Sequence, residues 1–97
     1  MMTSSQKWEF FELTYVQFFK GDDIEISGGM LYGDDFSTGK SATTGHLNAE
    51  EAYKKHCDYM TKMGSLGWEL VSVTKFPRIV RGKNAVVQSF YFNRPAE

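Results

Sequence analysis

Apolar and polar positions along the chain form three strand-like runs and one helical run. Residues 8–19 are dense in aromatic and β-branched side chains with single polar interruptions, a pattern that favours a strand. Residues 68–76 and 85–93 have the same character, and the Pro, Gly and Asn residues of 77–84 predict a hairpin connection between them. The pattern therefore predicts one strand near the amino end and a hairpin at the carboxyl end.

The middle of the chain predicts a single amphipathic helix. Asn48 followed by Glu51 is a capping-box pattern, because the Asn side chain can accept a hydrogen bond from a free N–H of the first turn. At 100° per residue one side of the helix is mainly apolar, and its members are Ala49, Ala52, Tyr53, His56, Tyr59, Met60 and Met63. The opposite side is charged, and Gly64 is expected to end the helix in a left-handed conformation.

The remaining segments complete the predicted architecture. Residues 21–47 are rich in Gly, Ser, Thr and Asp, so we expect a long loop with room for one extra strand. The 97 residues make one domain, and residues 1–7 are expected to form a flexible tail. The predicted fold class is α+β, with one helix packed on a mainly antiparallel sheet of three or four strands in the order β(β)αββ.

One run of residues is more distinctive than the rest of the chain. Residues 63–73 read MGSLGWELVSV, and with the early Trp8-Glu9 and the closing FYFNRP of residues 90–95 they resemble the domain of unknown function 4177 family of short prokaryotic proteins. That family has a Trp-Glu first strand, a helix, a Leu-Gly-x-x-Gly-Trp-Glu-Leu turn and a last strand ending in Phe-Lys-Arg-Pro. Met63 and Asn93 depart from this pattern. The resemblance covers most of the chain and implies a fold, because the family has no assigned chemistry.

Composition narrows the classes of function. Eleven basic and twelve acidic residues leave a net charge of −1, so no overall field attracts nucleic acid or anionic lipid. The single cysteine excludes an internal disulfide and fits a reducing compartment. The amino-terminal residues lack the apolar stretch of a signal peptide, and no apolar run approaches the roughly 20 residues that span a bilayer. We expect a cytoplasmic protein without a membrane partner.

Two motifs suggest chemistry that their spacing does not support. Residues 33–41, GDDFSTGKS, resemble a phosphate-binding loop, but Asp34 stands where that motif requires its first glycine. His56 and Cys57 are adjacent on the helix, about 100° apart, and cannot easily share one metal ion, while His46 is distant in sequence. We therefore expect no metal, no cofactor and no catalytic residue.

Two groups of residues are candidate binding sites. His56 lies at the centre of the apolar stripe, where a histidine either has a hydrogen-bonding partner or lines a cavity. The candidate ligand-binding residues are His56, Tyr53, Tyr59 and Trp68. The candidate basic patch is the hairpin tip, formed by Lys75, Arg78, Arg81 and Lys83, for which ordinary solvated charge is the simpler interpretation.

The leading functional hypothesis is a non-catalytic binding or interaction module that acts as a homo-oligomer, most simply a homodimer. Apolar residues occupy both faces of every predicted strand, and a single helix covers only one face, so a second copy would cover the other. A fold-back of residues 21–47 as a lid is the competing explanation. The alternative functions are a small-ligand enzyme with a pocket around His56 and a nucleic-acid binder that uses the basic hairpin tip.

Overall fold

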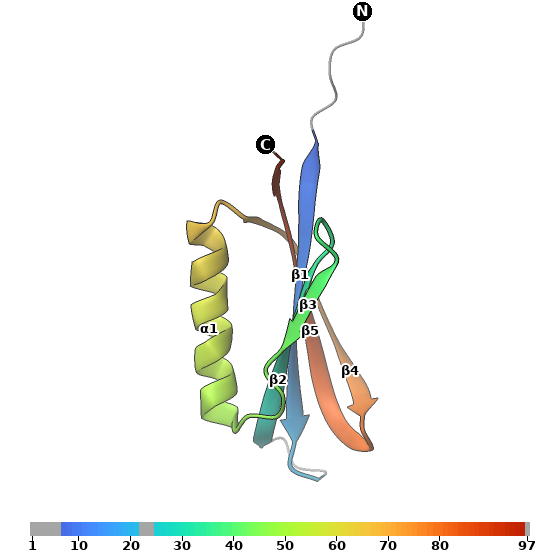
Figure 1. The fold of residues 1–97 in the computed structure, drawn as a ribbon. Coiled ribbons are helices and arrows are strands. Elements are labelled where there is room, and N and C mark those ends of the chain that lie inside the picture. Colours follow the sequence, from blue (N-terminus) through green and yellow to red (C-terminus); the bar gives the residue numbers. More distant parts are fainter. Residues whose placement is uncertain (1–6, 22–24, 97) are drawn as a thin grey trace, which may run out of the picture.

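The computed structural model describes residues 7–21 and 25–96. Its elements, in chain order, are β1 (Trp8–Phe19), β2 (Ile26–Asp35), β3 (Lys40–Thr43), α1 (Ala49–Ser65), β4 (Glu69–Val80) and β5 (Lys83–Pro95). The strands form one antiparallel sheet in the order β3-β2-β1-β5-β4. The helix lies against one face of this twisted sheet (Figure 1). The α+β class is confirmed, as is the first strand.

The number and order of strands differ from the prediction. Both β2 and β3 fall within residues 21–47, so the sheet has five strands in the order βββαββ, and this segment extends the sheet rather than covering it. Three of its glycines, Gly28, Gly29 and Gly33, are strand residues at which another part of the chain approaches closely. A Cβ on Gly29 would lie 2.8 Å from the Cβ of Ala52 in α1. Glycine is therefore the residue that lets the helix approach the sheet here.

The connection between β4 and β5 is shorter than the predicted loop. Arg81 and Gly82 form the turn with φ values of 52° and 75°. Two consecutive positive φ values match the twist of the flanking strands in a two-residue hairpin. Strand β4 therefore continues to Val80, and β5 begins at Lys83. Pro77 lies inside an edge strand rather than in a loop.

The prediction for the start of α1 is confirmed, and the prediction for its end is wrong. The capping box is confirmed, because the Asn48 side chain accepts from the backbone N–H of Glu51 at 2.8 Å. The prediction for Gly64 is wrong, since Gly64 is helical and Gly67 takes the left-handed φ of 85°. The N–H groups of Trp68 and Gly67 donate to the carbonyls of Met63 and Gly64 at 3.0 and 3.1 Å, which is a Schellman motif.

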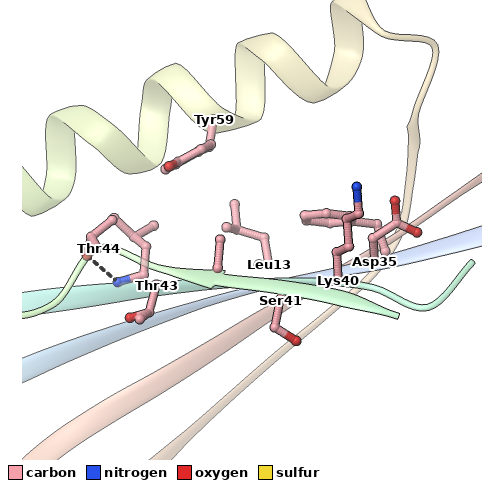
Figure 2. A pocket seen from close by; sticks show the side chains of 11 residues that line it. Leu13, Asp35, Lys40, Ser41, Thr43, Thr44 and Tyr59 are labelled. Carbon is pink, nitrogen blue, oxygen red and sulfur yellow. Dashed lines mark hydrogen bonds between the residues drawn. The ribbon is translucent and has the colours of Figure 1, made fainter. Parts of the chain in front are cut away.

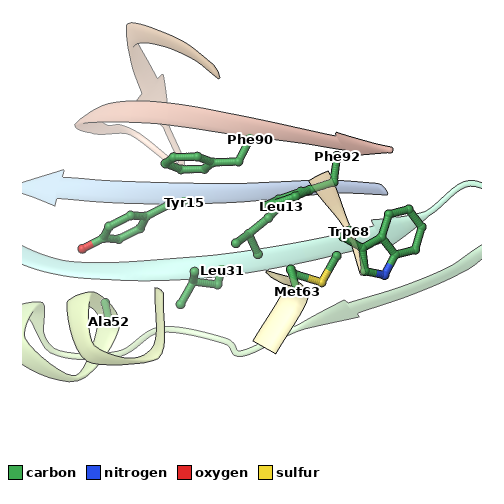
Figure 3. Packing of buried hydrophobic residues seen from close by; sticks show 8 residues of the cluster. All are labelled: Leu13, Tyr15, Leu31, Ala52, Met63, Trp68, Phe90 and Phe92. Atoms are coloured by element: carbon green, nitrogen blue, oxygen red, sulfur yellow. The ribbon is translucent and has the colours of Figure 1, made fainter. Parts of the chain in front are cut away.

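Two groups of buried side chains lie on the two faces of the sheet. The cluster under the helix is mainly aromatic and aliphatic (Figure 3), and its members are Leu13, Tyr15, Leu31, Ala52, Met63, Trp68, Phe90 and Phe92. The cluster on the helix-free face consists of Val16, Phe18, Met30, Ala85 and Val87. Beside the second cluster, Thr14, Ser89 and Thr74 align across β1, β5 and β4. The helix-free face is therefore more polar at its middle than the sequence pattern indicated.

The predicted flexible tail of residues 1–7 lies outside the described residues except for Lys7. The Lys7 carbonyl accepts a hydrogen bond from the Ala96 N–H at 2.8 Å. This bond continues the pairing of β1 with β5 by one step beyond Trp8 opposite Pro95. Lys7 and Ala96 therefore lie side by side at the same end of the sheet.

Candidate functional site

His56 is a packed residue at the interface between the helix and the sheet. Its ring lies 4.7 Å from that of Tyr15, stacked at 28°, and 4.8 Å from that of Phe90. Burial lowers the pKa of His56 below its ordinary value of 6.5, so the imidazole is neutral at pH 7. Its Nδ1 atom is buried, and no described residue offers it a hydrogen bond. Contacts with two rings, one stacked and one tilted, hold this histidine between the helix and the sheet.

The four predicted ligand-binding residues do not share one pocket. Tyr53 is 62% exposed, and Trp68, at 7%, belongs to the buried cluster beneath the helix end. His56 lies between Tyr15 and Phe90, as described above. Tyr59 is the member that lines a pocket, and it does so on the side of α1 that faces β2 and β3.

That pocket is an apolar hollow of about 320 Å³ between α1 and the β2–β3 edge of the sheet (Figure 2). The Tyr59 ring descends from the helix as one wall, and the sheet supplies the floor. The floor combines bulky and very small side chains, namely Phe11, Leu13, Leu31, Gly33 and Ala42. Gly33 and Ala42 are opposite one another in the β2–β3 register. The Phe11 ring covers Gly33, whereas Ala42 contributes only a methyl group to the floor beneath Tyr59.

Polar groups stand at the two ends of the hollow. At one end lie Thr43 and Thr44, and at the other end Asp35 and Lys40 point up from the sheet (Figure 2). Thr44 is occupied, because its Oγ1 accepts from the Leu31 N–H at 3.1 Å and donates to the Gly45 carbonyl at 2.8 Å. No residue in the described ranges gives the Tyr59 hydroxyl a hydrogen bond. The polar groups that a ligand could contact are thus the Tyr59 hydroxyl, the Asp35 carboxylate and the Lys40 ammonium.

The four residues of the predicted basic patch do not form one surface. Register places Lys75 on the helix side of the sheet, opposite Gln88 and Tyr15, and places Arg78 on the other side, opposite Ala85. The Arg78 guanidinium lies 5.6 Å from the Phe76 ring centre, and the Lys83 ammonium lies 5.9 Å from that of Phe18. These long side chains cover part of the helix-free cluster.

Arg81 is in the turn at the tip of the hairpin, with a positive φ. Proteins that bind single-stranded nucleic acid commonly combine cations along one groove with aromatic rings on which bases stack. Here Lys75 faces the opposite side from Arg78, and the Phe18 ring beneath Lys83 is buried at 2% exposure. The four cations are therefore distributed over both sides of the sheet and the tip of the hairpin.

An exposed apolar surface on β4 was not singled out in the sequence. Register aligns Leu70 with Phe92 and Val73 with Phe90, two residues of the cluster beneath the helix, so both side chains lie on the helix side. Pro77 and Ile79 follow on the same side by alternation. Leu70, Val73 and Ile79 are 42%, 48% and 74% exposed. We call Leu70, Val73, Pro77 and Ile79 the β4 shelf.

The shelf is bare because of where the helix lies. The principal contacts of α1 are with β2, at the far side of β1 from β4. The helix therefore leaves β4, at the far edge, uncovered on this face of the sheet (Figure 1). Periodicity within a strand shows two faces but not which strands lie beneath a helix, so the sequence contained no direct signal for the shelf.

The motif residues of the carboxyl half meet those of the amino end around one arginine. Arg94 Nε donates to the Glu9 carboxylate at 3.0 Å, and Arg94 Nη1 donates to the Leu66 carbonyl at 2.9 Å. The same guanidinium lies 4.2 Å from the centre of a Trp68 ring. One side chain thus joins β1, the end of α1 and β5, which indicates a structural role for the Trp-Glu, Gly-Trp-Glu-Leu and Arg-Pro segments.

Within residues 7–21 and 25–96, no three His, Cys, Asp or Glu side chains are grouped so that they could hold a metal ion. No helix in the described part of the chain is long and apolar enough to cross a membrane. Comparisons with protein-family models, curated proteins and solved structures found no match to this chain.

Proposed function

We propose that this protein is a non-catalytic interaction module that acts as a homodimer, in which two copies meet through the β4 shelf. The observation that carries the proposal is the exposure of large apolar side chains along one side of a long edge strand. Soluble monomers rarely leave extended apolar patches in water, and such patches commonly mark interaction surfaces. Membership of the domain of unknown function 4177 family stays a prediction beside it.

A second copy is the simplest partner for this surface. A twofold axis brings the same patch of both subunits together, so an apolar shelf meets an identical apolar shelf. A stable interface needs roughly 800 Å² from each partner, more than the shelf alone provides. Tyr53 of α1 and Leu66, which directly follows the helix, are exposed and can extend the contact on the helix side. Lys75 lies within the shelf, where its aliphatic stem can pack while its ammonium reaches water.

Face packing is favoured over the addition of one β4 edge to another. Pro77 has no N–H, so it removes one donor from the strand that would have to pair with a second chain. The register also shifts between Leu70 and Ser72, which bends the edge near its start. Proline and irregularities of this kind are common protections against edge pairing.

The proposal can be tested by the oligomeric state of two matched variants. Val73→Glu places a charge on the shelf, whereas Thr74→Glu places the same charge on the next residue, which faces the opposite side of the sheet. We expect wild type and Thr74→Glu to sediment at twice the mass of one chain at micromolar concentration, and Val73→Glu to sediment as a monomer. Far-ultraviolet circular dichroism checks that both variants are folded.

Two outcomes would contradict the proposal. Monomeric wild-type protein at these concentrations would exclude the homodimer. Dissociation by Thr74→Glu, with Val73→Glu remaining dimeric, would move the interface to the helix-free face. The enzyme alternative is less favoured because His56 lies between two rings and is not among the residues that line the hollow.

A further inference from the structure

The hollow beneath Tyr59 has the size and composition of a ligand site. Binding pockets for small molecules are mostly apolar, occupy about 300 to 1,000 Å³, and carry a few polar groups that orient the ligand. This one measures about 320 Å³ and has an apolar floor. Its small size limits the occupant to a molecule with a single ring system or a short branched chain.

The charges at the mouth select the polar end of that occupant. Asp35 and Lys40 are opposite one another in the register of β2 and β3, and both line the hollow. No ion pair joins them among the described residues. The mouth therefore presents one anion and one cation side by side, with no excess of either sign.

The positions of the two charges are set differently. Asp35 is held by the turn, because its Oδ1 accepts from the backbone N–H groups of Ser37 and Thr38 at 2.9 and 3.3 Å. Its other oxygen is left for a cation. Lys40 is exposed and has a long stem, so its ammonium can move to meet an anion at the mouth. A ligand that carries both an ammonium and a carboxylate can engage both residues.

We propose that the hollow binds a small zwitterion with an apolar body, of which an apolar α-amino acid is the simplest form. Its side chain lies on the floor formed by Leu13, Gly33 and Ala42, against the ring of Tyr59. Its carboxylate pairs with Lys40, and its ammonium pairs with the free oxygen of Asp35. The proposal is independent of the homodimer, because the hollow is at the β3 edge of the sheet and the shelf is at the β4 edge.

The first test compares ligands that share an apolar body and differ in charge. Titration by heteronuclear nuclear magnetic resonance would use L-tryptophan, indole-3-propionate, which lacks the ammonium, and tryptamine, which lacks the carboxylate. L-Leucine provides a second zwitterion with a smaller body. We expect at least one of the two amino acids to shift the amide signals of Ala42 and Thr44 in a saturable way. That amino acid should bind at least tenfold more tightly than the two singly charged indoles.

The second test changes the protein. Lys40→Gln and Asp35→Asn each remove one charge, and the Asn side chain retains an oxygen that can cap the turn. Each should weaken binding of the amino acid at least tenfold. Ala42→Trp fills the hollow and should abolish binding. Asp34→Asn changes the neighbouring carboxylate, which faces the other side of the sheet and accepts from Ser41 Oγ, so it should leave binding unchanged.

The possible results divide clearly. The proposal would be overturned if neither amino acid produced a saturable shift at concentrations up to about 10 mM, because the dissociation constant would then be too high for a useful ligand. Equal binding of indole-3-propionate and L-tryptophan would also overturn it, because the ammonium would then make no contribution. If Ala42→Trp fails to fold, the two charge variants at exposed or half-buried positions still decide the outcome. A wild-type chain that is monomeric but binds the amino acid would refute only the proposed function.

Discussion

At the scale of single residues, the most informative positions are those whose role is set by close neighbours. Arg94 is one, since its guanidinium donates to a carboxylate and a helix-terminal carbonyl and also lies over an indole ring. A lysine at this position could not maintain all three contacts, because it lacks the planar guanidinium. Gly67 is another, because the turn after α1 requires its positive φ. The first two residues of the distinctive Gly-Trp-Glu-Leu run, Gly67 and Trp68, thus have structural roles at the end of α1.

His56 leads to a prediction about stability and pH. Burial lowers the pKa of its imidazole in the folded state, so the unfolded chain binds the proton more readily. The free energy of unfolding should therefore fall as the pH decreases below 6.5, by at most about 1.4 kcal/mol per pH unit. Urea denaturation at several pH values between 7.5 and 5 would measure this slope, and His56→Phe should flatten it.

A control variant separates the two histidines of the chain. His46→Gln removes the other histidine and leaves His56 between its two aromatic neighbours. The slope that remains in this variant belongs to His56. An unchanged slope in His56→Phe would show that the folded and unfolded states bind the proton of His56 equally.

A pair of glycine substitutions tests how closely the helix approaches the sheet. Gly29→Ala would place its Cβ 2.9 Å from the Val16 carbonyl oxygen, a backbone atom that cannot move alone, so we expect a loss of about 1 to 3 kcal/mol. Gly64→Ala adds a Cβ with no other atom within 4 Å at a helical position, so we expect a gain of about 0.5 to 1 kcal/mol. Thermal unfolding compares the two, and effects of the same sign would contradict the proposed packing.

At the scale of elements, the amphipathic pattern of α1 was predicted correctly, but the part of the helix and sheet that becomes buried is smaller than the pattern indicates. The buried residues of α1 are Ala52 and Met63, with Met60 partly buried against the same cluster. Tyr53 and Tyr59, on the margins of the predicted apolar stripe, remain exposed at 62% and 38%. The helix therefore makes a narrow contact along one line of residues. This narrow contact leaves room for the hollow on one side and leaves β4 uncovered on the other.

At the scale of the whole molecule, the order of strands separates the two proposed surfaces. The hollow lies beside β3 and the shelf lies on β4, at opposite edges of the sheet. Four inter-strand steps of about 4.8 Å place these edges roughly 19 Å apart. Sites at this distance without shared partners usually contribute independently.

This separation leads to a prediction about variants that affect only one edge. Val73→Glu should abolish the dimer and leave the affinity for the amino acid within about twofold of the wild-type value. Ala42→Trp should abolish binding of the amino acid and leave the dimer intact. Nuclear magnetic resonance titration and sedimentation of the same two samples provide both measurements. A change of more than tenfold in ligand affinity on Val73→Glu would contradict the independence of the two edges.

The sequence by itself determined the local features of this protein. The bounds of β1, the α1 cap at Asn48 and the α+β class follow from side-chain periodicity and hydrogen bonds between near neighbours. The tertiary structure alone decided which strand each side chain lies beside. Gly29 and Gly33 predict a loop when propensity alone is considered, but they are strand residues because Ala52 and Phe11 occupy the space that a side chain would need. The hollow and the β4 shelf depend on where the helix crosses the sheet, which no local pattern specifies.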